Sequence, residues 1–415
     1  VGTWNTARPQ TDNTVSIYPR IWQFDNFGED VICQIIDGKS FLFDTSDGIN
    51  ARATQITNAP TKNAFSIVAP VERHFICFGT ELTIGDTTTQ DPMLVRFSNQ
   101  EDINNFVARN ENTAGDMRLN GGSKIVTAIK SRGQILIITD TSLHGMQYVG
   151  TPYTYAFQQL GANCGCIGPH AAIDVNGQAF WMGEDSFHVF DGSSKKLISP
   201  VEDYVFDDIN KTQAYKVHVG HVSQFNEIIW WYCSSSSNSI DRWVSYNYLE
   251  STWSVGTMPR TAWSDSGTFD KPQGAEYFPD STADTYNTIH GLTSGRSLLY
   301  NQEDGINGNG SAINTFLQSG YFDIGDGEQV MFMKKFIPDF KEQQNNLTVQ
   351  LILKKYPNAN ATISSSDLHT VTPTTEKVDT RARGRQIALK IQSQSADTTW
   401  RFGTLRVETQ PDGLR

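Results

Sequence analysis

The chain has 415 residues, enough for more than one hydrophobic core, and a formal net charge of −12. The charge is uneven, since residues 1–312 carry 20 Lys and Arg against 34 Asp and Glu, whereas residues 313–415 carry 13 against 11. Nucleic-acid binders gain affinity by neutralising phosphates with Lys and Arg, so the acidic body argues against a tight DNA- or RNA-binding protein, though not against one that DNA slides past.

No apolar run in the sequence reaches the length of a membrane span, and we find no signal peptide. The sequence starts at Val1 in a polar stretch. We therefore expect residues 1–18 to be an N-terminal arm or the remnant of an upstream segment that is missing or cleaved.

A strand-turn-strand pattern recurs about every fifty residues up to residue 305. Each copy ends in an aromatic residue, and successive closing aromatics are 54, 51, 42, 56 and 54 residues apart: Phe43, Phe97, Tyr148, Phe190, Tyr246 and Tyr300. This period is typical of β-propeller blades, because one four-stranded sheet cannot bury both faces until neighbours pack against it. We predict an all-β fold in which residues 19–310 form a β-propeller of about six blades.

Helical patterns are nearly absent from this region. Two short helix candidates, 100–109 and 200–210, lie between repeat units, where a propeller has its connections. Trp230 and Trp231, with Trp243 and Trp253, are predicted to pack within and between blades, because adjacent strand residues face opposite sides of a sheet.

Past about residue 311 the fifty-residue pattern stops and simple alternation begins. The alternating apolar positions are Leu347, Val349, Leu351, Leu353, Ile387, Leu389 and Ile391. Alternation places one face of a strand on a core and the other in water, as in an antiparallel sandwich. We predict a smaller β-sandwich-like domain over residues 311–415, with the Gly/Asn-rich segment 303–312 as the boundary.

The five cysteines, an odd number, are Cys33, Cys77, Cys164, Cys166 and Cys233. Four lie in apolar or Gly-rich strand contexts, which favours reduced, buried thiols in a protein assembled in the cytosol. In NCGCIGPH, Cys164, Cys166 and His170 invite a zinc interpretation, but a matching second ligand pair is missing. We predict the tight, Gly-rich start of a strand instead.

Other motifs also give no catalytic assignment. His218 and His221 are predicted to point to opposite strand faces as packing or surface residues. The stretch SDSGTF, with Asp265, Gly267 and Phe269, partly matches the Asp-box of sialidases but is one imperfect copy, so we interpret it as an ordinary turn. We expect no enzyme activity and no catalytic, cofactor-binding or metal-ligating residues.

Three arginines alternate in TRARGRQ: Arg381, Arg383 and Arg385. Side chains two positions apart project from one face of a strand, so these cations are interpreted as a solvated edge that discourages edge-to-edge pairing. A polyanion or partner-protein contact is the alternative.

Several segments, in the same order along the chain, resemble the tail hub or nozzle proteins of short-tailed bacteriophages, the tail tubular protein B-like and packaged-DNA stabilisation-like proteins. The resemblance includes RIWQFDNFGEDVICQIIDGKSFLFDTSDG, VRFSNQEDINNF, GGSKIVTAIKSRGQILIITDTSLHGMQYVG, FWMGEDSFHVFDG, EIIWWYCSSSSNSIDRWVSYNYLESTW and WRFGTLRVETQPDGLR. It covers most of residues 19–305 and the last thirty or so. Two departures are the missing upstream segment and Gly291, where relatives often have an acidic residue.

The resemblance implies a propeller and a sandwich-like platform arranged as a ring, usually a hexamer, around the channel by which DNA leaves the virion. It implies a structural protein of the virion tail, assembled in the bacterial host cytoplasm and without catalytic residues. Its expected partners are other copies of itself, tail adaptor or portal-side proteins, and tail fibre or spike proteins. Double-stranded DNA would pass non-specifically. The candidate loops for gating the channel are 82–91 and 264–285.

Two alternatives stay open at this point. A glycan-binding or glycan-degrading propeller predicts a cluster of aromatic and carboxylate side chains at one mouth of the propeller. A generic protein-binding propeller scaffold predicts monomers without a channel. The sequence identifies neither the phage and host nor the ring stoichiometry.

Overall fold

The computed structural model describes residues 21–278, 296–308, 310–323, 327–358, 363–365 and 368–413. Contacts divide the chain into two units, Val1–Gln302 and Glu303–Arg415. The division falls at the start of the Gly/Asn-rich segment 303–312. The expected arm 1–18, Gly291 and residues 279–285 of the predicted loop 264–285 lie outside the described residues. The described part of that segment contains the strand β22 (Gln273–Phe278), so the prediction of a continuous loop there is wrong.

The described part of the first unit consists of six antiparallel sheets that follow one another along the chain. In sequence order, the first sheet is β1 (Trp22–Phe27), β2 (Asp30–Ile35), β3 (Ser40–Phe43) and β4 (Thr54–Gln55). The second is β5 (Phe65–Val68), β6 (Phe75–Phe78), β7 (Leu94–Phe97) and β8 (Gly115–Arg118). The third is β9 (Ile125–Ser131), β10 (Gln134–Thr139), β11 (Ser142–Gly150) and β12 (Thr154–Ala162).

The remaining three sheets repeat the same up-and-down order. The fourth is β13 (Ala172–Val175), β14 (Gln178–Met182), β15 (Phe187–Phe190) and β16 (Ser194–Leu197). The fifth is β17 (His218–Val222), β18 (Glu227–Tyr232), β19 (Arg242–Asn247) and β20 (Thr252–Thr257). The sixth has three strands, β21 (Ala262–Ser264), β22 (Gln273–Phe278) and β23 (Arg296–Asn301).

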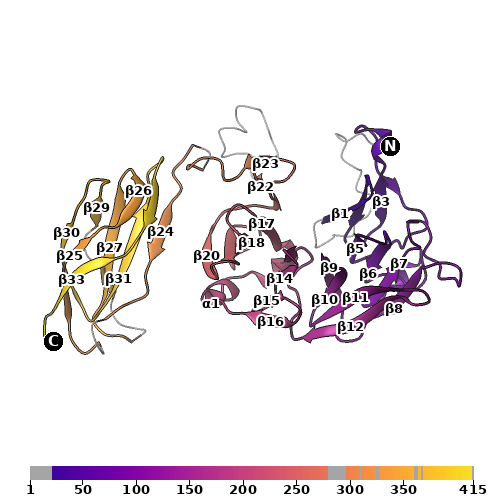
Figure 1. Cartoon of the computed structure of the whole chain (residues 1–415), viewed down its shortest axis with the longest axis horizontal. Coiled ribbons are helices and arrows are strands. Elements are labelled where there is room, and N and C mark those ends of the chain that lie inside the picture. The colour runs from indigo at the N-terminus through magenta and orange to yellow at the C-terminus, as the bar shows by residue number, and fades with distance from the viewer. Residues whose placement is uncertain are drawn as a thin grey trace. The chain divides into compact units, whose positions relative to one another are not determined.

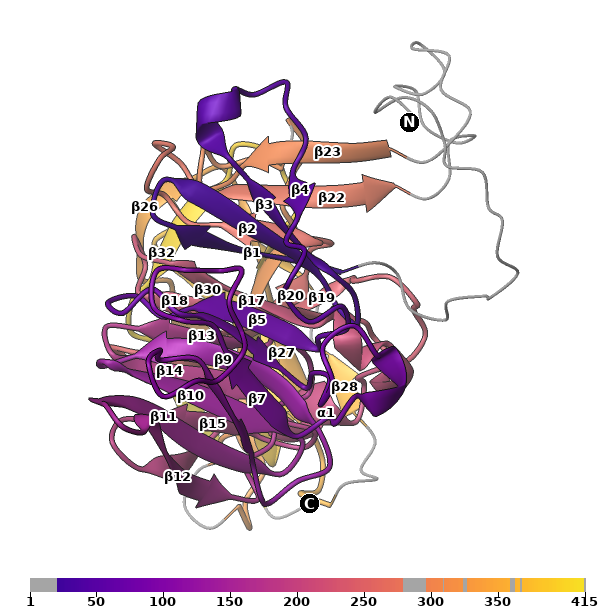
Figure 2. The same ribbon diagram turned by 90° about the vertical axis from the view of Figure 1, so that its right-hand side faces the viewer.

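The first strands of consecutive sheets lie next to one another: β1 with β5, β5 with β9, β9 with β13, β13 with β17 and β17 with β21. The sheets therefore form an arc from β1 to β23 (Figure 1), and the view turned by 90° shows β1–β3 above β10–β12 (Figure 2). Successive four-stranded meanders that pack through their first strands are the blades of a β-propeller. The predicted all-β propeller of about six blades is confirmed.

Hydrophobic clusters fill the spaces between blades. One cluster joins the first and second blades, one the second and third, one the third to fifth, and one the fifth and sixth. Trp230 belongs to the cluster of the third to fifth blades, whereas its neighbour Trp231 belongs to that of the fifth and sixth. The predicted packing of the tryptophans on opposite blade faces is confirmed.

Buried and partly buried indoles also link blades through hydrogen bonds. Trp181 Nε1 in the fourth blade donates to the Cys164 carbonyl at 2.9 Å. Trp230 Nε1 in the fifth donates to Ala171 at 3.0 Å, and Trp263 Nε1 in the sixth donates to the His221 carbonyl at 3.0 Å. In each case the acceptor lies in the preceding blade or in a segment directly next to that blade, so each indole satisfies its N–H while packing between blades.

The helix prediction is right at one place and wrong at the other. A short helix, α1 (Glu202–Phe206), lies inside the candidate 200–210. Residues 100–104 form turns and 105–109 have no regular structure, because Asp102 accepts a hydrogen bond from the Asn104 backbone at 3.1 Å and the Asn99 backbone bonds to Asn105 at 2.7 Å. Such local bonds compete with a helix. The described residues of this unit also include three 3-10 segments, Thr45–Asp47, Thr87–Thr89 and Lys211–Lys216.

The second unit contains ten short strands in the residues described. They are β24 (Thr315–Gln318), β25 (Met331–Ile337), β26 (Phe340–Gln344), β27 (Leu347–Lys354), β28 (Ile363–Ser365), β29 (His369–Val371), β30 (Val378–Gly384), β31 (Gln386–Ser393), β32 (Thr399–Phe402) and β33 (Arg406–Pro411). One sheet has the order β24-β31-β27-β28, with β29 also on β27; a second is β30-β25-β33, and β26 pairs with β32.

The core of the second unit lies between its two larger sheets. Alternate residues of β27 and β31 pack against Met331, Met333 and Phe336 of β25. All seven apolar positions singled out in the sequence belong to this core. Two antiparallel sheets face to face around one core form a β-sandwich, as predicted.

Candidate functional sites

The NCGCIGPH segment connects the third blade to the fourth. Both of its cysteines are buried, and Cys166 Sγ contacts the Gly168 carbonyl at 3.1 Å. Burial raises the pKa of Cys166 to about 12, so its thiol stays protonated. The Cys164 and Cys166 backbones bond to Thr141 and Thr139, which makes the segment the tight start of the fourth blade.

All five cysteines are free; four are buried and Cys33 is partly buried. Burial raises the pKa of the Cys233 thiol to about 11 and that of Cys33 above its ordinary value. These thiols are unreactive packing groups rather than nucleophiles. Among the described residues, no group of three or more His, Cys, Asp and Glu is placed to hold a metal ion.

The two histidines of β17 point to opposite faces of the fifth blade, as expected from strand alternation. His218 is buried and stacks on Trp231, with ring centroids 5.0 Å apart. His221 Nε2 lies 3.2 Å from the Tyr248 hydroxyl. Burial lowers the pKa of His218 to about 4 and also lowers that of His221, so both rings are neutral packing groups at neutral pH.

The partial Asp-box lies in the connection between β21 and β22 of the sixth blade. Asp265 accepts hydrogen bonds from the Ser223 backbone at 3.1 Å and from the Ser266 backbone at 2.8 Å. Its carboxylate also lies 3.4 Å from His221 Nδ1. The side chain therefore fixes two loops together, in agreement with the turn interpretation.

Arg381 and Arg383 are exposed on one side of β30, which is an edge strand of its three-stranded sheet. Arg383 pairs with Asp412, and Arg385 donates to the Glu328 carbonyl. The arginines thus mark a solvated edge, as predicted, and two of the three already have partners.

The candidate gating loop 82–91 is held at its base by a buried carboxylate. Glu81 accepts hydrogen bonds from Gly85 N at 2.7 Å and from Thr61 Oγ1 at 2.5 Å. Arg96 donates to the Leu82 carbonyl at 2.7 Å. These bonds hold the loop at Leu82 and at Gly85 against the second blade.

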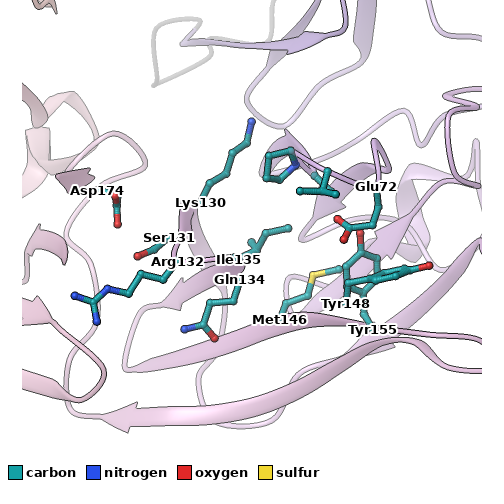
Figure 3. A pocket seen from close by; sticks show the side chains of 14 residues that line it. Glu72, Lys130, Ser131, Arg132, Gln134, Ile135, Met146, Tyr148, Tyr155 and Asp174 are labelled. Carbon is teal, nitrogen blue, oxygen red and sulfur yellow. The ribbon is translucent and has the colours of Figure 1, made fainter. Parts of the chain in front are cut away.

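A pocket of about 200 Å³ lies between the second, third and fourth blades, and we call it the inter-blade pocket (Figure 3). It is bounded by residues 69–72 after β5, by 130–135 across the β9–β10 turn, by Met146, Tyr148 and Tyr155 of β11 and β12, and by Asp174 of β13. Hairpin turns between first and second strands meet here, at one end of the blades.

The cations of the inter-blade pocket are already paired. Lys130 Nζ lies 2.7 Å from an Asp25 carboxylate oxygen, and Arg132 donates to the Asp191 carbonyl at 3.1 Å. In contrast, Ser131 Oγ and Asp174 Oδ2 are buried and have no hydrogen-bond partner among the described residues. The other oxygen, Asp174 Oδ1, accepts from Gly177 N at 3.1 Å.

Sequence reasoning missed the inter-blade pocket because its walls come from three repeats. Only Tyr148 had been singled out, as a closing aromatic. The turns Arg132–Gly133 and Asn176–Gly177 have positive φ at both residues, which is the signal of a two-residue hairpin and could have placed Ser131 and Asp174 beside such turns. No local pattern indicates that they line one cavity.

No known family model and no curated protein matches the sequence. Among solved structures, a fungal alcohol oxidase of the AA5 family in complex with copper is 9% identical, with a TM-score of 0.44 over 89% of this chain and 78% of that one. The N-terminal domain of Nup159 is 9% identical, with a TM-score of 0.34 over 61% and 71%. Apo AztD from Citrobacter koseri is 9% identical, with a TM-score of 0.30 over 57% and 71%. These distant likenesses carry no functional argument, and the fold assignment rests on the sheet topology.

In the part of the chain that the structure describes, no helix is long and apolar enough to cross a membrane.

Proposed function

We propose that this chain is a non-enzymatic structural protein of a short-tailed phage tail, a hub or nozzle subunit. It forms a ring around the DNA exit channel, retains the packaged DNA and conducts it at ejection. The observation that carries this proposal is the two-part architecture: a propeller followed along the chain by a sandwich, in the order implied by the sequence resemblance. Its location is the virion tail, after assembly in the host cytoplasm.

The build of the propeller supports a rigid wall segment. Its interior is filled by blade-to-blade clusters, and indole N–H groups donate to backbone carbonyls across blade boundaries. Close-packed interiors resist deformation. Such a wall keeps its shape while DNA moves past it.

The charge of the first 312 residues supports passage without sticking. We propose that part of their 34 carboxylates faces the channel, where they repel the phosphate backbone and prevent trapping by counterion release. A ring whose inner surface is neutral or basic, with the acids on its outside, would contradict this part of the proposal.

The sandwich is the proposed site of subunit and adaptor contacts. A ring needs two different patches on each subunit, because its interfaces are head to tail. The sandwich has separate exposed sheet faces, and its edge strand β30 presents the exposed side chain of Arg381, which an acidic neighbour could contact. Adaptor or portal-side proteins and tail fibre or spike proteins are the other proposed partners.

Negative-stain electron microscopy of the purified chain tests the proposal. We expect rings with a central channel, whereas particles that are all monomers would overturn it. A chain without residues 311–415 should remain a soluble propeller, with the far-ultraviolet circular dichroism of folded strands, but should form no rings. If that truncated chain still forms rings, the sandwich is not the assembly domain.

A further inference from the structure

The inter-blade pocket has two sides, which belong to opposite faces of the third blade. In the strand register Ile135 lies opposite both Lys130 and Met146, so these side chains share the face that turns to the second blade. Ser131 and Asp174 lie on the other side, toward the fourth blade (Figure 3). We call the side toward the second blade the tyrosine side. Its other lining residues include Pro70, Val71, Glu72, Tyr148 and Tyr155.

The carboxylate of Glu72 is the uncompensated charge of the tyrosine side. The nearby cations are paired elsewhere, since Lys130 Nζ lies 2.7 Å from Asp25 and the Arg73 guanidinium lies 4.0 Å from Glu101. Within the described residues Glu72 itself has no ion-pair partner. A pocket side with one unpaired negative charge favours a cationic ligand.

Two tyrosine rings lie beside this carboxylate. The rings of Tyr148 and Tyr155 meet edge to face with centroids 5.7 Å apart, and Tyr148 is 36% exposed. Burial, and after it the charge of Glu72, raises the pKa of Tyr155, which means that the carboxylate is close to these rings. Figure 3 shows the three side chains together, away from Asp174. A cation over the face of a tyrosine ring is attracted by the negative face of the ring.

Hydrogen bonds behind the rings hold them in place. The Tyr155 hydroxyl lies 3.0 Å from His74 Nδ1, and His74 Nε2 lies 3.0 Å from the Thr113 hydroxyl. Burial lowers the pKa of His74 to about 4, so this ring adds no positive charge that would compensate Glu72 at neutral pH. A site fixed before its ligand arrives loses less entropy on binding.

Among organic cations, a guanidinium group fits these neighbours best. It is planar, so it stacks on an aromatic ring while its N–H groups form two parallel hydrogen bonds with a carboxylate. The apolar stem of an arginine finds matching surface on Pro70 and on Val71, which is 79% exposed. The α-carboxylate of a free amino acid would need a cation, and Lys130 on this side is already paired. An arginine within a protein chain therefore fits better than free arginine.

We propose that the tyrosine side of the inter-blade pocket binds the side chain of an arginine in a partner protein, with the guanidinium group between the Glu72 carboxylate and the Tyr148 ring. The whole pocket of about 200 Å³ is smaller than the roughly 300–1,000 Å³ of pockets for drug-sized ligands, so it accepts one side chain. This inference does not depend on ring formation or on a phage tail, and either proposal can fail alone.

Saturation-transfer difference NMR of the full chain tests the site with Nα-acetyl-L-arginine amide, whose blocked ends imitate an arginine within a protein. The matched probe is Nα-acetyl-L-citrulline amide, which has the same shape but an uncharged urea group. We expect a Kd in the millimolar range for the arginine probe and binding about fivefold weaker or less for the citrulline probe. Equal binding of the two probes would overturn the inference, as would tighter binding of free L-arginine than of the blocked probe.

Two variants locate the binding. Glu72→Gln keeps the shape of the side chain and removes its charge, so the arginine probe should bind about tenfold more weakly. Tyr148→Leu keeps an apolar side chain and removes the ring, which should weaken binding about threefold.

The matched controls are Glu111→Gln and Tyr153→Ala, which change an exposed carboxylate and an exposed tyrosine that do not line the pocket. Both should bind the arginine probe like the unchanged chain. If Glu72→Gln keeps the full affinity, or if a control loses as much affinity as Glu72→Gln does, the site is not the one proposed. Thermal unfolding curves show whether each variant has kept the fold.

Discussion

The propeller and the sandwich are both antiparallel β-structures, yet they bury different side chains. Every cysteine, all six histidines whose pKa is lowered by burial, and the fully buried tryptophans Trp181, Trp230 and Trp231 lie in the propeller. The core of the sandwich consists of Met, Leu, Val, Ile, Phe and Ala.

The difference follows from the number of buried faces. A middle blade is covered on both sides, so adjacent residues such as Trp230 and Trp231 are both inside, and polar groups are buried with them. A sandwich sheet buries one face only, and β27 alternates strictly between buried and half-buried residues. We therefore expect the stability of the propeller to fall when a buried side chain is shortened, when a side chain is added at a close backbone contact, or when the pH falls. We expect the same changes to affect the sandwich less.

The largest expected effect is that of Trp230→Ala. This change empties a site shared by the third to fifth blades and removes the indole hydrogen bond to Ala171, so the unfolding free energy of the propeller should fall by about 3–5 kcal/mol. Guanidinium titration followed by tryptophan fluorescence measures it. Trp400→Ala is the counterpart in the sandwich, where the indole is only half-buried, and should cost less. Equal losses would remove the contrast between the two units.

Acid should destabilise the propeller before the sandwich. Burial lowers the pKa of His74 and His218 from 6.5 to about 4. The unfolded chain binds protons near pH 6.5 and the folded propeller does not, so stability is lost as the pH falls from about 6.5 towards 4. Each histidine contributes at most on the order of 3 kcal/mol. Calorimetry at about pH 7.5 and 4.5 should show the propeller transition moving to lower temperature by more than the sandwich transition.

The variant His218→Phe provides the control for acid sensitivity. Phenylalanine keeps a ring against Trp231 and cannot take up a proton, so this chain should lose less stability on acidification. An unchanged acid response would mean that His218 does not contribute to it.

The fold was predictable from the sequence where its signals are local. The period of the closing aromatics gave the blades, and alternation along β27 and β31 gave the sandwich core. The helix prediction for 100–109 was wrong because Ile103 and Phe106, which pack between the first and second blades, have a spacing that also suits a helix. Asn99 and Asp102 favour turns instead. Side chains that compete for backbone hydrogen bonds decide such cases.

Contacts between blades were not predictable in this way. The bond from Trp230 to Ala171 spans 59 residues, and the pair Lys130–Asp25 spans 105. Ser131 and Asp174 line one pocket only because β9 and β13 lie side by side. A single sequence contains no local pattern for such neighbours, so the candidate site became visible only in the structure.

The smallest predicted effect tests how closely the backbones of neighbouring blades approach. A Cβ on Gly165 would lie 1.9 Å from the Asp140 carbonyl oxygen, and neither backbone can move without disturbing the junction of the third and fourth blades. Gly165→Ala should therefore lower the free energy of unfolding of the propeller by about 1–3 kcal/mol. At Gly267 in the propeller and Gly320 in the sandwich, no atom lies within 4 Å of an added Cβ. Changing either of these two glycines to alanine should leave the midpoint temperatures of both unfolding transitions unchanged. If Gly165→Ala also does so, the NCGCIGPH segment is looser than its contacts indicate, and the propeller would owe its stability to side-chain packing alone.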